Sequence, residues 1–299
     1  MIYLESFRFP TEGDEVGYLL NNRKLDMTCY SVNNIYPFKI FPERGLKRLD
    51  FSPITLLYGG NGSGKSTALN IIAQKLQLAR MSPFNRTPFF EDYLGFCRAD
   101  LARDAAPPQG SCIITSDDVF DFMLNLRTLN EGVDRNREEL FDEWQRLRDN
   151  RGEHGGTRFQ MRSLEDLDEL VRRRDAWTHT RSDFTARRIP ANIHGQSNGE
   201  SAYGYFAEKI RGNALYLLDE PENSLSAERQ AELATFLADS ARFYGCQFII
   251  STHSPFLLAL RGAKIYDLDA APVSVRRWTD LPNVRLYFNF FEERREEFL

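Results

Sequence analysis

The sequence predicts an α/β fold, in which apolar strands alternate with amphipathic helices along most of the chain. Two features carry this prediction. A glycine-rich loop at residues 59–67 stands between an apolar strand and a helix. A second apolar strand, at residues 214–218, ends in two adjacent carboxylates, Asp219 and Glu220. Both features place polar groups at the carboxyl end of a buried strand, where open α/β sheets carry their binding sites.

Length and composition narrow the class of protein. The chain has 299 residues, 42% hydrophobic and 27% charged, which suits one sizeable globular domain or a domain with a subdomain. No apolar run approaches the length needed to cross a bilayer, and the first residues lack a signal-peptide layout. The four cysteines are far apart, which predicts neither a zinc site nor a disulfide framework. A net charge of −5 does not by itself indicate nucleic-acid binding. We expect a cytoplasmic protein with reduced thiols and no membrane partner.

The segment before the glycine-rich loop predicts a β layer. Residues 2–9 alternate at the strand period, and residues 27–32 form a second candidate strand. Residues 11–22 between them are polar and contain glycine, which predicts a loop. An aromatic residue here is able to stack on a base, but packing into the β layer explains any one of them, so none is singled out.

The glycine-rich loop fits G-x-x-x-x-G-K-[ST], whose backbone N–H groups wrap the phosphates of a nucleotide. The strand at residues 54–58 enters the loop, and a helix through Ala68 leaves it with its positive dipole end toward the phosphates. Lys65 is expected to reach the β- and γ-phosphates of ATP, and the Ser66 hydroxyl to ligate Mg²⁺. The residues expected to bind the nucleotide are Gly59, Asn61, Gly62, Ser63, Gly64, Lys65, Ser66 and Thr67.

The next stretch reads as loops, a strand and a helix. Residues 81–110 have weak periodicity and predict irregular loops, residues 111–115 a strand, and residues 118–129 a helix. Asp117 and Asp118 lie at the junction of that strand and helix. They either reach a metal-bound water or cap the helix, and we favour capping.

Residues 134–188 differ in character. Two amphipathic helices are indicated, one by apolar positions from Leu140 to Leu147 and one by those from Leu164 to Val171, with Ser163 as an N-cap. The glycines of residues 152–157 separate them. The arginines of this region are Arg172, Arg173, Arg174, Arg181, Arg187 and Arg188. They form either a solvated helix face or a contact to nucleic acid. We interpret the segment as an inserted helical subdomain, too short for a long coiled-coil arm.

The second half of the chain supplies the acidic groups. Asp219 is expected to hold Mg²⁺, and Glu220 to orient or deprotonate the attacking water. The strand at residues 247–251 leads to His253, which lies where a γ-phosphate would be. Residues 197–201 open a helix and offer a second anion-binding end. The remaining predicted elements are a helix at 227–244, strands at 264–268 and 273–278, and a terminal helix at 289–299.

These elements, in this order, resemble the ABC-type ATPases, in particular the non-transporter branch with the SMC and recombination-repair ATPases and the stand-alone bacterial ATPases. Residues 59–66 match the Walker A motif, and residues 215–220 match Walker B and its catalytic glutamate. Residues 197–201 are similar to the signature motif, with Gln-Ser-Asn-Gly-Glu at residues 196–200 in place of Leu-Ser-Gly-Gly-Gln. Residues 224–226 fall at the D-loop and His253 at the switch histidine. No Q-loop glutamine can be placed.

The resemblance implies an ATP-hydrolysing enzyme with an ABC-type P-loop NTPase core, an N-terminal antiparallel β layer and an inserted helical subdomain. The corresponding parts are residues 1–130, 131–190 and 191–299. It also implies a head-to-tail homodimer that holds two ATP molecules. In that dimer Ser197 and Gly199 of one subunit would close on the γ-phosphate held by the other.

Three biological roles stay open at this point. The first is an ATPase whose dimerisation controls an effector, such as a nuclease or toxin, in bacterial anti-phage defence or a toxin-type system. It is favoured because residues 219–226 and 251–255 are similar to stand-alone ATPases of such operons. The second is a DNA-repair or chromosome-associated ATPase that binds DNA through the arginines from Arg172 to Arg188. The third, a transporter subunit, is disfavoured by the missing Q-loop.

Overall fold

The computed structural model describes residues 1–21, 35–149, 167–189 and 198–299. They belong to two compact units, which are described separately: unit 1 is Met1–Phe120 with Asn198–Leu299, and unit 2 is Asp121–Ser197. Unit 2 overlaps the segment 131–190 that the sequence assigns to an insert. None of the described helices is both long and apolar enough to cross a membrane.

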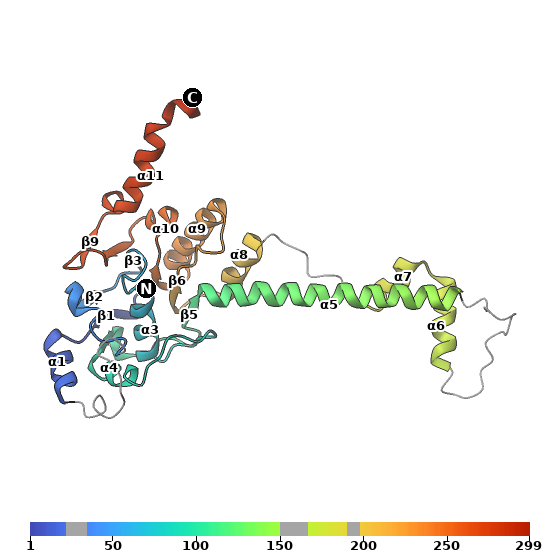
Figure 1. The fold of residues 1–299 in the computed structure, drawn as a ribbon, viewed down its shortest axis with the longest axis horizontal. Helices are drawn as coiled ribbons and strands as arrows, with labels where there is room; N and C mark the ends of the chain where they lie inside the picture. The colour runs from blue at the N-terminus through green and yellow to red at the C-terminus, as the bar shows by residue number, and fades with distance from the viewer. Residues whose placement is uncertain (22–34, 150–166, 190–197) are drawn as a thin grey trace. The chain divides into compact units, whose positions relative to one another are not determined.

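Unit 1 is built on a six-stranded sheet with the order β5-β6-β7-β3-β8-β9 (Figure 1). The strands are β3 (Ile54–Tyr58), β5 (Cys112–Thr115), β6 (Leu215–Asp219), β7 (Gln247–Ser251), β8 (Lys264–Asp267) and β9 (Ser274–Arg276). All neighbours pair in parallel except β8 with β9. Every residue of β3 and β7 is buried, which explains their continuous apolar sequences. The predicted α/β fold is confirmed, and the carboxyl ends of β3, β6 and β7 lie at one edge.

A three-stranded antiparallel sheet, in the order β2-β1-β4, forms the predicted N-terminal β layer. Its strands are β1 (Leu4–Arg8), β2 (Arg48–Asp50) and β4 (Arg98–Leu101). The predicted irregular loops of residues 81–110 were wrong in part, because this stretch also contains α4 (Phe90–Phe96). The strand β4 pairs with β1, which is distant in sequence, so local periodicity could not reveal it. The candidate strand at residues 27–32 lies outside the described residues.

The predicted loop between the first two strands was also wrong, because it contains the helix α1 (Glu12–Asn21). Thr11 and Asp14 form a capping box: the Thr11 N–H donates to Asp14 Oδ2 at 2.9 Å, and the Asp14 N–H donates to Thr11 Oγ1 at 3.3 Å. The ring of Tyr18 stacks on Phe38 at 4.7 Å. A good cap and an aromatic anchor therefore outweigh the two glycines that suggested a loop.

The other helices of unit 1 are α3 (Lys65–Lys75), α8 (Asn198–Lys209), α9 (Ala227–Phe243), α10 (Pro255–Leu258) and α11 (Pro282–Glu293). Leu69 and Ile72 of α3 belong to one buried core with Leu217 and Ile249 of the sheet, so the helix that follows the glycine-rich loop is held rigidly. The helix α11 begins well before the predicted start at residue 289. Proline in its first turn has a φ that suits a helix start.

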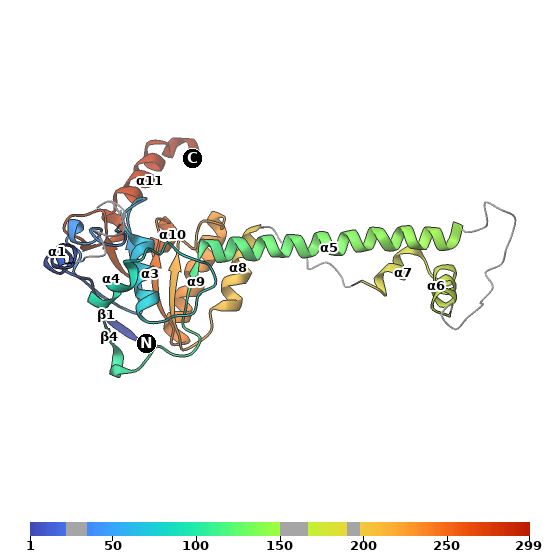
Figure 2. The same cartoon turned by 60° about the horizontal axis from the view of Figure 1, so that its bottom comes forward.

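Unit 2 contains most of α5 (Ser116–Asp149), together with α6 (Leu167–Thr178) and α7 (Arg181–Ala186) (Figures 1 and 2). Two separate helices were predicted along the stretch that α5 covers, and this was wrong. α5 is one helix of 34 residues, because the single Gly132 lowers helix stability without ending the helix. Ser163 and the glycines of 152–157 lie outside the described residues.

Candidate functional site

The glycine-rich loop connects β3 to α3 and folds as a tight curl. Gly62 and Gly64 have φ values of 79° and 92°, which favour glycine. A Cβ at Gly59 would lie 2.6 Å from Ser63 Oγ, so a side chain there would push Ser63 out of place. Most of the predicted loop residues line one cavity of about 220 Å³ together with Glu220: Asn61, Gly62, Ser63, Gly64, Lys65, Ser66 and Thr67. The structure thus brings the loop and the predicted base together.

Lys65 is directed back over its own loop. Its side chain is only 4% exposed, and Nζ donates to the carbonyl oxygens of Gly59 at 2.7 Å and Gly60 at 3.1 Å. The same Nζ lies 3.5 Å from Glu220 Oε1. The buried ammonium is therefore fixed at the mouth of the loop beside a carboxylate, where an incoming phosphate oxygen can replace the carbonyl partners.

Ser66 and Asp219 meet at the carboxyl edge of the sheet. Asp219 Oδ1 accepts hydrogen bonds from Ser66 Oγ at 2.9 Å and from Ser251 Oγ. Burial raises the pKa of Asp219, and the two hydroxyl donors oppose that rise because they stabilise the ionised form. A carboxylate beside a hydroxyl is an oxygen donor set that fits Mg²⁺, which takes few protein ligands and completes its shell with water and phosphate.

A polar cavity of about 500 Å³ opens beside this pair. Its lining residues are Tyr36, Ser66, Thr67, Asn70, Arg80, Pro83, Phe84, Asn85, Thr115, Ser116, Asp117 and Asp219. Asp118 turns away and caps α5 as predicted, because its Oδ2 accepts from the Thr115 N–H at 2.7 Å and from Thr115 Oγ1 at 2.9 Å. Asp117, for which capping was also predicted, instead lines the cavity with Ser66 and Asp219.

Glu220 has a left-handed backbone, with φ at 47°. Such a conformation costs about 1 kcal/mol or more in a residue with a side chain, and structures keep it where other contacts enforce it. Here the Glu220 N–H donates to Ser251 O at 3.1 Å and to Ser251 Oγ at 3.0 Å. Its Oε2 accepts from Asn223 Nδ2 at 3.0 Å. The strand end and the turn therefore hold this carboxylate facing Lys65.

His253 lies on the same side of the site, after β7. Its Nδ1 is 3.9 Å from Glu220 Oε1 and 3.5 Å from Glu222 Oε1. The buried Glu222 Oε1 also accepts from the backbone N–H of His253 at 2.8 Å and from Thr252 Oγ1 at 2.7 Å. Sequence reasoning missed Glu222, although its place two residues after Glu220 in the same turn could have suggested a role in fixing the histidine.

Two further residues that the sequence did not reveal support the loop from outside. Asp269 Oδ2 accepts the Gly60 N–H at 2.7 Å, and Arg44 Nη2 donates to Gly62 O at 3.2 Å. Arg44 Nη1 and Asp269 Oδ1 lie 3.7 Å apart and form an ion pair. Arg44 precedes the loop by 15 residues and Asp269 follows it by about 200, so no spacing pattern within the loop marked them.

Comparison with known families agrees with this geometry. Residues 146–259 match the model of the family described as "AAA domain, putative AbiEii toxin, Type IV TA system". That range contains Asp219, Glu220 and His253. A comparison with curated proteins gives no significant match.

Solved structures resemble this chain only distantly. The Smc head domain with an extended coiled coil from Pyrococcus furiosus, bound to the C-terminal domain of ScpA, is 14% identical, with a TM-score of 0.43 over 99% of this chain and 100% of that chain. The SMC head domain from Thermotoga maritima is 15% identical, with a TM-score of 0.39 over 92% and 99%. A dimeric ATP-binding cassette bound to ADP and phosphate is 14% identical, with a TM-score of 0.36 over 78% and 90%.

The signature-like segment is only partly described, since Ser197 lies outside the described residues. Gly199 is in the first turn of α8, where an added Cβ would meet Arg229 Cγ at 3.7 Å and the Ser226 nitrogen at 3.8 Å. Arg229 also pairs with Glu200 at 3.1 Å. Gly199 and Glu200 therefore pack on the start of α9.

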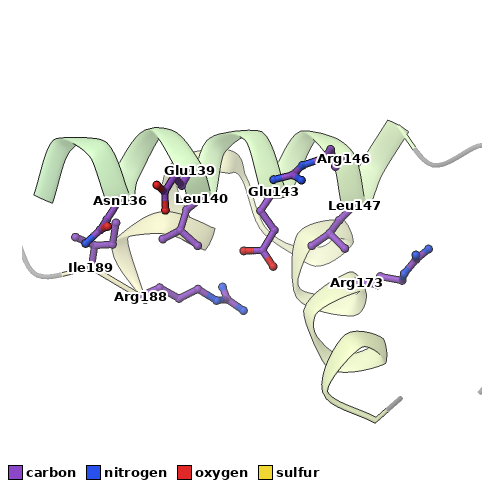
Figure 3. A pocket seen from close by; sticks show the side chains of 9 residues that line it. All are labelled: Asn136, Glu139, Leu140, Glu143, Arg146, Leu147, Arg173, Arg188 and Ile189. Atoms are coloured by element: carbon purple, nitrogen blue, oxygen red, sulfur yellow. The ribbon is translucent and has the colours of Figure 1, made fainter. Parts of the chain in front are cut away.

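The arginines of unit 2 are largely engaged within the unit. Arg172 Nη1 lies 3.2 Å from Glu143 Oε1, and Arg188 Nη2 lies 3.0 Å from Asp175 Oδ2. The Arg181 guanidinium lies 4.5 Å from the centroid of the Phe141 ring. A cavity of about 680 Å³ separates these helices (Figure 3). It is lined by Asn136, Glu139, Leu140, Glu143, Arg146, Leu147, Arg173, Arg188 and Ile189. Its charges are of both signs, and Glu143 and Arg188 point into the same space, which does not favour a phosphate backbone.

Proposed function

We propose that this chain is a Mg²⁺-dependent ATPase. The observation that carries the proposal is the convergence of Lys65, Ser66 and Glu220 on the cavity of the glycine-rich loop, with Asp219 hydrogen-bonded to Ser66 beside it. The loop amides and Lys65 bind the phosphates, and Ser66 and Asp219 are the residues that would hold Mg²⁺. The metal supplies positive charge to the phosphate oxygens when it is bound.

The hydrolytic step follows from the place of Glu220. Its carboxylate takes a proton from a water molecule as the water oxygen attacks the γ-phosphorus. The bond from that phosphorus to the bridging oxygen breaks, and ADP and phosphate leave. Asn223 and the backbone of Ser251 fix the carboxylate, and His253 lies close enough to Glu220 to orient the same water or the γ-phosphate.

We further propose that ATP joins two copies head to tail, with Ser197 and Gly199 of one copy completing the site of the other. The place of Gly199 supports this reading, because the atoms within 4 Å of a Cβ at that position belong to Arg229 and Ser226. Closure of the dimer would control an effector, such as a nuclease or toxin, in anti-phage defence or a toxin-type system. The toxin-system family matched by residues 146–259 supports this role. The DNA-binding alternative loses support because Arg172, Arg181 and Arg188 have internal partners.

We place this activity in the cytoplasm. The described cysteines, Cys97, Cys112 and Cys246, are all free thiols, as in proteins kept in a reducing compartment.

Steady-state ATP turnover of Glu220→Gln tests the catalytic assignment. Loss of a general base typically costs 10²- to 10⁴-fold in rate, so we expect turnover to fall by about that factor while nucleotide binding is retained. Glu228→Gln, on the exposed first turn of α9, is the matched control and should retain wild-type turnover. Wild-type turnover in Glu220→Gln would show that another group takes the proton. Absence of turnover in the unmodified chain with every partner present would reject the ATPase proposal.

A further inference from the structure

The helix α11 carries a broad apolar face that is open to solvent. Five of its large side chains are exposed by roughly half or more: Leu286 67%, Tyr287 45%, Phe288 57%, Phe290 47% and Phe291 53%. Leu286 and Phe290, like Tyr287 and Phe291, are four residues apart, so they form two adjacent rows on the helix. A stripe of this width is typical of a helix that is buried in a bundle.

The first turn of α11 is hydrogen-bonded to residues beside the candidate site. Leu281 and Val284 are buried, and Asn283 makes two hydrogen bonds to the body of unit 1. Its backbone N–H donates to Tyr58 Oη at 3.2 Å, and its Nδ2 donates to the carbonyl oxygen of His253 at 3.0 Å. The first turn therefore holds the helix in place, and the exposed rows begin directly after this anchor.

The exposed area approaches what a stable pair of proteins requires. A fully exposed aromatic side chain presents about 150–250 Å². With the rings of Tyr287, Phe290 and Phe291 about half exposed, Phe298 71% exposed and Leu286 added, this region presents about 500 Å² of apolar surface. A standard interface buries about 800 Å² on each partner, whereas the largest apolar patch of a monomer is about 300–600 Å².

The charges of residues 282–299 nearly balance, because this segment has three arginines and four glutamates. Arg295 Nη1 lies 3.5 Å from Glu292 Oε1, and Arg294 Nη1 lies 4.0 Å from Glu293 Oε2. A second α11 therefore meets no uniform charge that would repel it, and a strongly charged partner finds no field of opposite sign. An apolar helix face without a charge preference is well suited to pairing with its own copy around a two-fold axis.

We propose that α11 is a two-fold interface between two copies of this chain, formed through Leu286, Tyr287, Phe290 and Phe291 without nucleotide. This contact is separate from the ATP-dependent one and holds whether or not the chain hydrolyses ATP. Because Asn283 links α11 to the backbone of His253, the pairing would also anchor the histidine loop of each copy.

Light scattering of the full chain without nucleotide tests the pairing. We expect a mass of twice 34.6 kDa for the wild type. The variant Leu286→Glu/Phe290→Glu should have the mass of one chain, with at least tenfold weaker pairing. Phe243→Glu, at an exposed aromatic residue on another helix, is the matched control and should stay paired.

Two further measurements separate this interface from the ATP site and from misfolding. Lys65→Ala should keep the nucleotide-free dimer, and the α11 variant should keep its circular dichroism spectrum and its nucleotide binding. A wild-type mass of one chain without nucleotide, or an α11 variant that stays dimeric, would overturn the proposal. If the α11 variant no longer binds another protein but contains as many copies of this chain as the wild type, the face would belong to that protein. This result would also overturn the proposal.

Discussion

Glu15 is a buried carboxyl group whose ionisation opposes folding. It is 3% exposed, and its Oε2 accepts the Lys39 N–H at 2.7 Å, whereas Oε1 has no hydrogen-bond partner among the described residues. Burial raises the pKa of Glu15 from 4.5 to about 7, and the negative charges of Glu43, Asp14 and Glu12 add to the rise. The folded chain therefore binds this proton more tightly than the unfolded chain does.

Ionisation of Glu15 makes the free energy of unfolding depend on pH. Below about pH 4.5 the group is protonated in both states and costs nothing. As the pH rises from 4.5 to about 7, the free energy of unfolding falls by about 1.4 kcal/mol for each pH unit. Above the folded-state pKa the loss levels off at about 3 kcal/mol. Glu15→Gln removes the charge and keeps an acceptor for Lys39, but it leaves a buried amide donor that costs about 1 kcal/mol. We expect the variant to be about 2 kcal/mol more stable than the wild type at pH 8, and not more stable at pH 4.5.

Urea unfolding of wild type and Glu15→Gln at the two pH values measures this difference. Glu12→Gln, on the exposed side of the same helix, should change stability by only a few tenths of a kcal/mol at either pH. A difference between wild type and Glu15→Gln that is the same at both pH values would refute the reasoning. Destabilisation by Glu15→Gln at pH 8 would refute it as well.

Two substitutions at the candidate site give further predictions. Lys65→Ala removes a buried ammonium, and charge-assisted hydrogen bonds contribute about 1.5–3 kcal/mol, so we expect nucleotide affinity to fall by about 10- to 100-fold in a fluorescent-nucleotide titration. Lys75→Ala, at the other end of the same helix, should bind normally, and an equal loss in both variants would contradict the assignment. Asp219→Asn keeps an acceptor for Ser66 and Ser251 but removes a charge that burial disfavours. Nucleotide-free Asp219→Asn should melt at a higher temperature than the wild type. Calorimetry should show that its Mg²⁺-dependent nucleotide binding is weakened by tenfold or more. A lower melting temperature with unchanged Mg²⁺ dependence would contradict this.

The central part of the site could be predicted because its information is local. A buried strand, a glycine-rich curl and a helix N-terminus follow one another at residues 54–68, and an acidic pair follows directly on the strand that ends at Asp219. Parallel pairing of these strands with β7 then places their carboxyl ends at the same edge of the sheet.

The rest depends on contacts between distant segments or on competition between local effects. Asp269 reaches the glycine-rich loop from a segment about 200 residues further along the chain, and Arg44 from a turn outside the motif, and a pattern of spacing cannot show such approaches. In α1 the Thr11 cap outweighs two glycines, and in α5 a single glycine fails to end a long helix. Single-residue breakers are therefore weaker evidence than a cap or a packed face.

The solution mass of Glu220→Gln in Mg-ATP and in Mg-ADP, measured in the Leu286→Glu/Phe290→Glu background that removes pairing through α11, tests the central claim most directly. If Glu220 is the catalytic base and two copies share each nucleotide, ATP stays uncleaved and holds the copies together. The mass in Mg-ATP should then be twice the mass in Mg-ADP. Equal masses in the two nucleotides would contradict a composite site that ATP closes.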